Sequence, residues 1–330
     1  MDTPTRATTV HDVDTALLQG WPVPMPAIEG DKEIRGHVLV LGGSSEMPGA
    51  VILAATAALR AGAGKLTVAT GRSVAQLVAL AMPEARVIGL DEHESAGFSL
   101  DAVARLDPLA DRVDAILVGP GMRDEPATAR LVHALLPRFA AAGTSVVLDA
   151  CAMGALLHPP AEWPADRPWR FERPVVLTPH AGEMAHLTGI AKDAICARPD
   201  PQALEAARAW NAVVALKGAR TVIATPDGTL YQHEGGNVGL AISGSGDVLA
   251  GVIAGLAARG APLDQAACWG VALHARAGER LAQRMGTLGY LAREISQEIP
   301  ALLEHIAGKQ MQAGETETIR PTPVAWGTGE

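Results

Sequence analysis

The sequence predicts an α/β fold in which a central, mostly parallel sheet is covered by helices on both faces. Two observations lead to this prediction: short β-branched segments alternate with Ala-rich segments of helical length, and the chain contains few aromatic residues. Of the 330 residues, 48% are hydrophobic but only 3% are aromatic, so the core must be built from Ala, Val, Leu and Ile. Such residues are typical of buried parallel strands and of helices packed closely against them.

The first alternation gives a βαβ unit. Residues 37–42 (HVLVLG) are apolar and β-branched, as buried strands are, and a glycine turn separates them from an Ala-rich segment of helical length at 49–62. A second strand is predicted at 65–70. Two strands joined by a crossover helix are parallel and right-handed, so this unit begins a parallel sheet.

Further strands are predicted at four segments, each of which ends in Gly, Asp, Thr or Lys: 115–119, 145–149, 174–178 and 213–218. Because the carboxyl ends of parallel strands meet at one edge, and open parallel sheets bind ligands there, we expect these polar ends to form the binding site. Residues 221–236 differ, since Asp227-Gly228 lies between two β-prone segments and predicts an antiparallel hairpin. The sheet should therefore be mixed at that end.

The last third is predicted to be helical, with one long helix at 264–286 and another near 294–305. No repeat or linker divides the middle of the chain, so we expect one domain over about residues 26–306. Residues 1–25 are expected to be loosely ordered, and residues 307–330, which are polar and rich in Gly, Pro and Thr, to form a mobile tail.

Charge and composition exclude several classes of function. The formal net charge is −9 and there is no dense Lys/Arg cluster, so we expect no nucleic-acid partner. No apolar run approaches the roughly 18 residues that span a bilayer, and the N-terminus lacks the pattern of a signal peptide. The three cysteines are widely spaced without a CxxC pair, which indicates neither disulfides nor zinc. A cytoplasmic protein with a small-molecule partner is expected.

The segment SGSGD, residues 243–247, carries the clearest chemical signal. Gly244 and Gly246 allow close approach to the backbone, and a helix starting near Asp247 would direct its free N–H groups toward a phosphate or a developing anion. Asp247 could then accept a proton from a hydroxyl beside that phosphate. The alternative is that Asp247 caps the helix and the glycines form an ordinary turn. The segment is neither a Walker A loop nor a GxGxxG fingerprint.

Seven segments, taken in order over about residues 30–305, resemble the NAD(P)H-hydrate dehydratases of the ribokinase-like superfamily. They are GGSSEMPGA (42–50), VGPGM (118–122), LDACAM (148–153), LTPHAGEM (177–184), LKGART (216–221), GNVGLAISGSGDVLAG (236–251) and AREISQEIPALL (292–303). The resemblance implies a ribokinase-like fold and repair of hydrated NADH or NADPH. A nucleotide would phosphorylate the hydroxyl on the damaged ring, and loss of phosphate would restore the double bond.

The resemblance also implies cofactors and partners. ADP is the phosphoryl donor in bacterial members of the family and ATP in eukaryotic ones, so an ADP-dependent enzyme with Mg²⁺ is expected. Many members carry an epimerase domain of their own, and here the NAD(P)H-hydrate epimerase is expected to be a separate chain. A homo-oligomer is expected from the family and from the Ala-rich helices; a tetramer is one candidate, and the number of subunits stays open. The preference between ADP and ATP stays open, as does that between NADH and NADPH.

Site residues follow residue by residue from the same motifs. Asp247 matches the catalytic base, and the anion hole corresponds to Gly244, Ser245 and Gly246. The substrate-binding positions are Ala50, Gly121, His180 and Asp247. The nucleotide-binding positions are Lys217, Gly218, Ala219, Arg220, Thr221 and Gly246. The metal ligands are unknown.

Two residues of the LTPHAGEM motif have alternative interpretations. His180 follows a strand directly, where a histidine is often a structural hydrogen-bonding residue, while the resemblance implies substrate contact. Glu183 either caps the following helix, which we favour, or helps to hold a hydrated magnesium ion. His274, within the long helix, is interpreted as structural.

The chain departs from the usual family motifs at four positions, namely Cys151, Arg123, Ile242 and Ser243. Cys151 replaces an acid, Arg123 replaces a glycine, and the other two stand where threonine and glycine are frequent. These departures leave open a ribokinase-like kinase acting on a vitamin or sugar alcohol, and a non-catalytic nucleotide-binding protein. The KGART and LTPHAGEM matches speak against the first alternative, and an intact Asp247 against the second.

Overall fold

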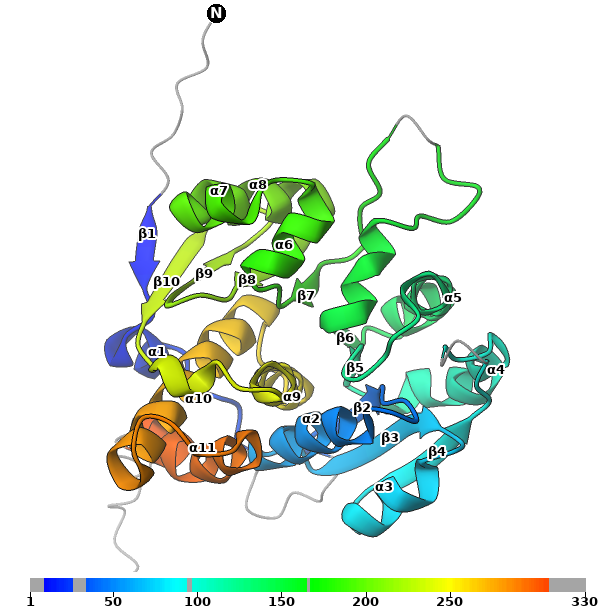
Figure 1. Cartoon of the computed structure of the whole chain (residues 1–330), viewed down its shortest axis with the longest axis horizontal. Helices are drawn as coiled ribbons and strands as arrows, with labels where there is room; N and C mark the ends of the chain where they lie inside the picture. The colour runs from blue at the N-terminus through cyan, green and yellow to red at the C-terminus, as the bar shows by residue number, and fades with distance from the viewer. Residues whose placement is uncertain (1–8, 26–33, 94–96, 165–166, 309–330) are drawn as a thin grey trace, which may run out of the picture.

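The structure, a computed structural model, describes residues 9–25, 34–93, 97–164 and 167–308. Its centre is a ten-stranded sheet (Figure 1). In spatial order the strands are β1 (Val10–Asp12), β10 (Leu230–Glu234), β9 (Arg220–Ala224), β8 (Ala212–Leu216), β7 (Val175–Leu177), β6 (Ser145–Leu148), β5 (Ala115–Val118), β2 (His37–Leu41), β3 (Lys65–Gly71) and β4 (Arg86–Leu90). Strand β9 is antiparallel to β8 and β10, and the other pairs are parallel. The predicted mixed sheet is confirmed.

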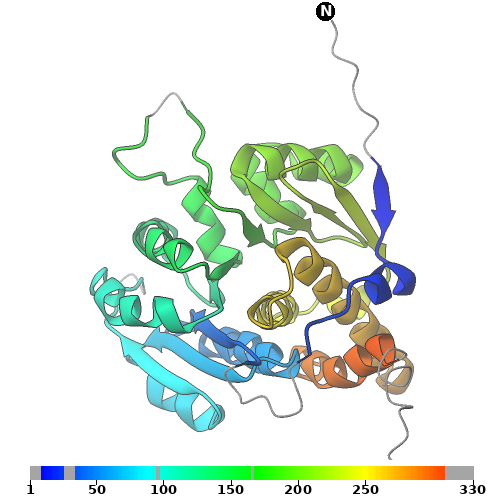
Figure 2. The same cartoon turned by 180° about the vertical axis from the view of Figure 1, so that it is seen from behind.

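Helices cover both faces of the sheet (Figures 1 and 2). One face carries α1 (Thr15–Gly20), α2 (Pro48–Arg60), α3 (Ala75–Ala81), α9 (Ser245–Ala258), α10 (Leu263–Met285) and α11 (Ala292–Ala307). The other carries α4 (Asp101–Leu106), η1 (Asp107–Arg112), α5 (Glu125–Ala141), η2 (Ala150–Leu156), α6 (Ala181–Thr188), α7 (Lys192–Ala197) and α8 (Pro199–Trp210). A further short 3₁₀ helix, η3 (Val238–Leu240), precedes α9.

The two helical layers enclose two cores because side chains alternate along each strand. In β2, Val38 and Val40 pack into one core and Leu39 and Leu41 into the other, all fully buried. Burial on both faces explains why this strand is apolar throughout, in contrast to the polar alternation of a strand with one wet face.

The hairpin predicted around Asp227-Gly228 joins β9 to β10. The carboxylate of Asp227 accepts a hydrogen bond from the main-chain N–H of Thr229 at 3.0 Å. Gly228 adopts a φ of +99°, which is readily accessible to glycine. The turn chemistry read from the sequence is confirmed.

Helices α2 and α9 pack with their backbones in contact. A Cβ atom on Gly251 would lie 2.1 Å from the carbonyl oxygen of Ala54, and one on Gly255 would lie 2.5 Å from that of Ala58. The two contacts have the same offset along parallel helices. One turn earlier on each helix, this register brings Asp247 level with Ala50, so the glycines set the position of both helix N-termini.

The structure differs from the expectation for the N-terminal segment. Strand β1 pairs with β10, and the side chain of Leu18 in α1 is fully buried. The indole N–H of Trp269 donates a hydrogen bond to the carbonyl of Trp21 at 3.0 Å. The segment is short and mixed in polarity, so its few apolar residues gave too weak a periodic signal, yet they fill the core beside α10 and α11.

The remaining boundary expectations concern the ends of the domain. Helix α11 ends at Ala307, next to the expected boundary, while residues 1–8 and 309–330 lie outside the described residues. Among the helices that the structure describes, none combines the length and apolar character needed to cross a membrane.

Candidate active site

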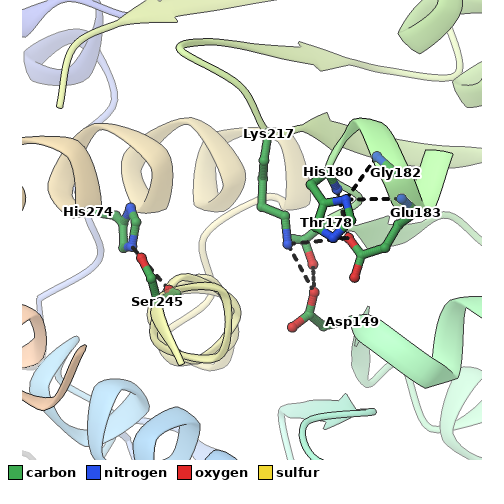
Figure 3. A network of polar contacts seen from close by, with 8 residues as sticks. All are labelled: Asp149, Thr178, His180, Gly182, Glu183, Lys217, Ser245 and His274. Atoms are coloured by element: carbon green, nitrogen blue, oxygen red, sulfur yellow. Dashed lines mark hydrogen bonds and ion pairs between the residues drawn. The ribbon is translucent and has the colours of Figure 1, made fainter. Parts of the chain in front are cut away.

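Polar residues from three neighbouring strands meet at the carboxyl edge of the sheet (Figure 3). Asp149 follows β6, Thr178 follows β7 and Lys217 follows β8. Helix α9 begins beside them with Ser245. This arrangement agrees with the expectation that the carboxyl ends of the strands form the binding site.

Asp247 is the third residue of α9, and the N-cap is Gly244 with a φ of +87°. This φ is one that residues with a side chain rarely adopt, so the turn favours glycine at position 244. Asp247 is therefore not the N-cap residue, and the capping interpretation is wrong. The N–H of Ser245 donates to the Ile242 carbonyl oxygen at 3.2 Å, and the next N–H groups of α9, those of Gly246 and Asp247, are left for a ligand.

The electrostatic environment of Asp247 suits a proton acceptor. Burial, followed by the nearby negative charge of Asp149, raises the pKa of Asp247 to about 7, although Lys217 opposes the shift. A carboxylate with a pKa near neutrality is partly ionised at pH 7 and is a stronger base than a solvent-exposed one. Asp247 has the protonation behaviour of a general base.

Lys217 lies among carboxylates. Its ammonium Nζ is 3.5 Å from Asp149 Oδ1 and 3.7 Å from Glu183 Oε2. Burial alone would lower the pKa of Lys217, but Asp149 and Glu183 outweigh it and raise the pKa above the usual value. Thr178 donates a 2.6 Å hydrogen bond to Asp149 Oδ1, which fixes that carboxylate. The site thus holds a charged ammonium group in a defined position.

His180 and Glu183 form a capping box at the start of α6. The main-chain N–H of His180 donates to Glu183 Oε2 at 2.7 Å, and the N–H groups of Gly182 and Glu183 donate to His180 Nδ1 at 3.0 Å. The cap interpretation of Glu183 is confirmed. Since Nδ1 accepts, Nε2 carries the proton of the neutral ring, whose side chain is 58% exposed and can donate to a ligand.

The segment from Lys217 to Thr221 comprises the turn between β8 and β9 and the first two residues of β9. Gly218 and Ala219 are exposed, and the Thr221 hydroxyl accepts a hydrogen bond from the Gly218 N–H at 3.4 Å and donates one to the Gly218 carbonyl oxygen at 3.3 Å. The guanidinium group of Arg220 is instead 2.7 Å from both Gln232 Oε1 and Asp200 Oδ1. The charge of Arg220 is thus paired within the protein, while the Lys217 ammonium points into the site.

The two loops expected to bind substrate touch each other. Gly121 has a φ of +70°, and a Cβ atom there would lie 2.6 Å from the Met47 carbonyl oxygen and 2.9 Å from Ala50 Cβ. An ion pair between Arg123 and Glu46 also joins the loops. The sequence singled out Arg123 as a departure but did not indicate its partner.

Two hollows bear on where a ligand binds. One of about 350 Å³ lies between η2, α5 and α6 and is lined by His180 and Glu183. A larger one of about 540 Å³ lies at the amino ends of β6 and β7, opposite the polar strand ends. The first adjoins the polar network, and we assign it to the candidate site.

A family model described as NAD(P)H-hydrate dehydratase matches residues 38–301. The chain belongs to the NAD(P)H-hydrate dehydratase family. An ADP-dependent (S)-NAD(P)H-hydrate dehydratase of Xanthomonas campestris is 49% identical over 90% of this chain and 97% of that protein. A bifunctional NAD(P)H-hydrate repair enzyme of Moorella thermoacetica is 42% identical over 90% of this chain, which spans 55% of that relative.

Solved structures of the dehydratase family have the same fold. An ADP/ATP-dependent NAD(P)H-hydrate dehydratase of Bacillus subtilis, co-crystallised with ATP and Mg²⁺, has a TM-score of 0.73 at 30% identity, covering 91% of this chain and 100% of that one. Ribokinase of Giardia lamblia, at 12% identity, has a TM-score of 0.50 and covers 81% of this chain and 99% of its own. The second likeness concerns the fold alone. The ribokinase-like fold is confirmed.

Sequence reasoning placed Asp149 and Thr178 at strand ends without giving either a role, and it interpreted His274 as structural. Asp149 and Thr178 stand at strand ends, and this position was the available signal. His274 in α10 is different, because its Nε2 lies 2.9 Å from Ser245 Oγ and 3.1 Å from the Ser245 carbonyl oxygen. That contact joins two helices and leaves no local pattern in the sequence.

Proposed function

We propose that this protein is an ADP-dependent (S)-NAD(P)H-hydrate dehydratase, a lyase that restores NADH or NADPH from the hydrated forms. The observation that carries the proposal is Asp247, whose pKa is raised to about 7 at the open N-terminus of α9. The identity to the Xanthomonas campestris dehydratase over nearly the full length of both chains supports the same reaction.

The first step is phosphoryl transfer to the ring hydroxyl of the hydrate. Asp247 takes the hydroxyl proton while the new O–P bond forms, and AMP leaves with the electrons of the broken P–O bond. Phosphate then leaves the ring carbon with the C–O electrons as the neighbouring carbon loses a proton. Each turnover consumes one ADP and gives one AMP, one phosphate and one reduced nicotinamide.

The protein contributes position and charge to this transfer, as in other phosphoryl transfers. The N–H groups of Gly244 and Gly246 face the phosphoryl oxygens as the anion hole, while Ser245 between them donates its N–H to the Ile242 carbonyl oxygen at 3.2 Å. A Cβ atom on Gly246 would lie 3.3 Å from Lys217 Nζ, so the ammonium group lies beside these amides. Lys217 therefore stabilises the charge of the transferred group.

Substrate and nucleotide approach Asp247 from opposite sides in this proposal. The hydrate contacts Ala50, Gly121 and His180, whose protonated Nε2 donates to it. The nucleotide contacts the exposed turn at Gly218 and Ala219 together with Thr221 and Gly246. Arg220 takes part through its backbone, since its guanidinium group is engaged by Asp200 and Gln232.

Magnesium fits this site as an ion that arrives with the nucleotide. Mg²⁺ is commonly held by one or two carboxylates with phosphate oxygens and water. Asp149 and Glu183 supply carboxylates beside the ammonium of Lys217, whereas the described residues contain no cluster of three His, Cys, Asp or Glu that could hold a metal. When bound, the ion would neutralise phosphate oxygens. A cytoplasmic location, a homo-oligomer and a functional link to an NAD(P)H-hydrate epimerase belong to the same proposal.

The test is recovery of reduced-nicotinamide absorbance from enzymatically hydrated NADH or NADPH with Mg²⁺ and either ADP or ATP, with Asp247→Ala as control. Recovery with ADP, lost in the variant, is the expected result. Nucleotide binding without recovery would contradict the proposal, and a panel of hydroxylated vitamins and sugar alcohols would then test the kinase alternative.

A further inference from the structure

Helix α10 contacts the anion hole from the side away from Lys217. Figure 3 shows α9 end-on, with Lys217 and Asp149 on one side and His274 meeting Ser245 on the other. His274 Nε2 lies 3.1 Å from the Ser245 carbonyl oxygen and 2.9 Å from Ser245 Oγ. Ser245 is 4% exposed, so this contact is shielded from water.

The contact determines which nitrogen of His274 carries the proton. A carbonyl oxygen only accepts hydrogen bonds, so Nε2 must donate to it. Burial lowers the pKa of His274 to about 4, which keeps the ring neutral at physiological pH. The neutral ring therefore holds its proton on Nε2, directed at the Ser245 carbonyl.

The Ser245 carbonyl and the Gly246 N–H belong to one planar peptide unit and point in opposite directions. Holding the carbonyl therefore also fixes the direction of the N–H. Gly244 and Gly246 flank Ser245, and glycine restricts backbone rotation least of all residues, so the contact with His274 adds a second constraint to this carbonyl at the frayed first turn of α9. We propose that His274 is a positioning residue of the anion hole, which holds the Ser245–Gly246 peptide so that the Gly246 N–H faces the transferred phosphoryl group. The inference rests on the proposed phosphoryl-transfer function.

Matched variants separate the hydrogen bond from the shape of the side chain. His274→Gln places an amide N–H near the position of Nε2, whereas His274→Met has similar length and no donor. His37→Met is the control, because His37 is also buried and lies 2.9 Å from a carbonyl (Arg112) and 2.9 Å from a hydroxyl (Thr67), but at the amino end of β2, away from the site.

Steady-state kinetics are normalised to ADP-binding sites counted by calorimetry, so that unfolded protein does not lower kcat. Loss of a properly directed anion-hole donor costs about 10²-fold in rate, so His274→Met should lower kcat by about 10- to 100-fold with little change in KM. His274→Gln should retain most of the wild-type kcat, and His37→Met should lower only the melting temperature. Unchanged kcat in His274→Met, or an equal loss in His274→Gln, would overturn the inference.

A binding measurement separates this inference from the proposed function. AMP with aluminium fluoride mimics the phosphoryl group in transfer and requires no hydrate. His274→Met should bind this pair about tenfold more weakly than wild type while binding ADP equally well, and equal binding of the pair would overturn the inference. Wild-type protein that binds the pair but does not restore NADH would refute the dehydratase function alone.

Discussion

The ammonium group of Lys217 lies 3.5 Å from Asp149 Oδ1 and 3.7 Å from Glu183 Oε2. One cation is thus shared by two carboxylates. Its charge does not fully compensate a third, Asp247, whose pKa is consequently raised to about 7 by burial and by the nearby negative charge. This balance of charge connects the fold at the strand ends to the proposed chemistry.

Asp247→Asn should lower kcat by about 10²- to 10⁴-fold, because the general base is lost while the shape of the side chain is kept. In wild-type protein kcat should rise with pH through about 7, since the base must be ionised. Stopped-flow rates between pH 5 and 9 measure the loss in the variant and the pH dependence of the wild type. A wild-type kcat that does not fall at low pH would contradict the role of Asp247 as general base.

The same residue should destabilise the folded protein. The folded protein binds the proton of Asp247 more tightly than the unfolded chain does, because the pKa is raised to about 7 in the folded state. The contribution of this group to the free energy of unfolding is therefore fully present below the unfolded pKa and is lost as the pH rises through about 7. Asp247→Asn should therefore raise the melting temperature more at pH 8 than at pH 5, by about 2–4 °C. Thermal unfolding at the two pH values measures the difference, and an equal shift at both would refute the explanation.

Lys217→Met should lower kcat by about 100-fold through loss of charge stabilisation. It should also move the acid limb of the pH profile to higher pH, because Lys217 is the charge that lowers the pKa of Asp247. Lys192→Met, at the start of α7, serves as the control for loss of a lysine. A lower rate with an unmoved acid limb would show that Lys217 and Asp247 are not coupled.

Arg123→Gly should raise KM for the hydrate by about two- to fivefold and leave kcat unchanged. The Arg123–Glu46 ion pair joins the loops of Gly121 and Ala50, but both partners are exposed, and such pairs contribute up to about 1 kcal/mol. Glu46→Gln should raise KM by a similar factor, and high salt should reduce the difference in KM between either variant and the wild type. A changed kcat at unchanged KM would argue against a role in substrate binding.

Gly251→Val should strongly destabilise the protein, since even a Cβ would lie 2.1 Å from the Ala54 carbonyl oxygen. Gly143→Val is the control, because a Cβ there meets no atom within 4 Å, although its φ of +82° adds backbone strain. Denaturant unfolding compares the two. A smaller loss for Gly251 than for Gly143 would refute the close packing of α2 and α9.

Much of the site was predictable because its residues stand at the ends of apolar strands. Lys217, His180 and Asp247 follow such segments or begin a helix, so local pattern and motif order located them. Asp149 could have been identified in the same way, because it directly follows an apolar strand. The contact between His274 and Ser245 could not have been, because it depends on how α10 packs against α9 and neither segment alone records it.

In the fold, too, features set by local sequence were predictable, and features set by packing between distant segments were not. Strands β2, β3 and β5 to β8 and the Asp227-Gly228 hairpin were predictable from local chemistry, whereas β4 was missed. Strand β1 was missed because all three of its residues are exposed, and main-chain pairing with β10 alone defines it. The pairing of α2 with α9 requires knowing which small residues face each other, and the sequence does not contain that information in any single segment.

The most direct test of the proposed chemistry follows the oxygen of the ring hydroxyl. NADH hydrated in H₂¹⁸O carries the label on that hydroxyl, and the phosphate released with Mg²⁺ and ADP can be analysed by mass spectrometry. Phosphorylation of the hydroxyl followed by C–O cleavage predicts one ¹⁸O atom in each phosphate, with one AMP and one NADH formed. Unlabelled phosphate would contradict the account, because the nucleotide would then be hydrolysed by water without acting on the substrate.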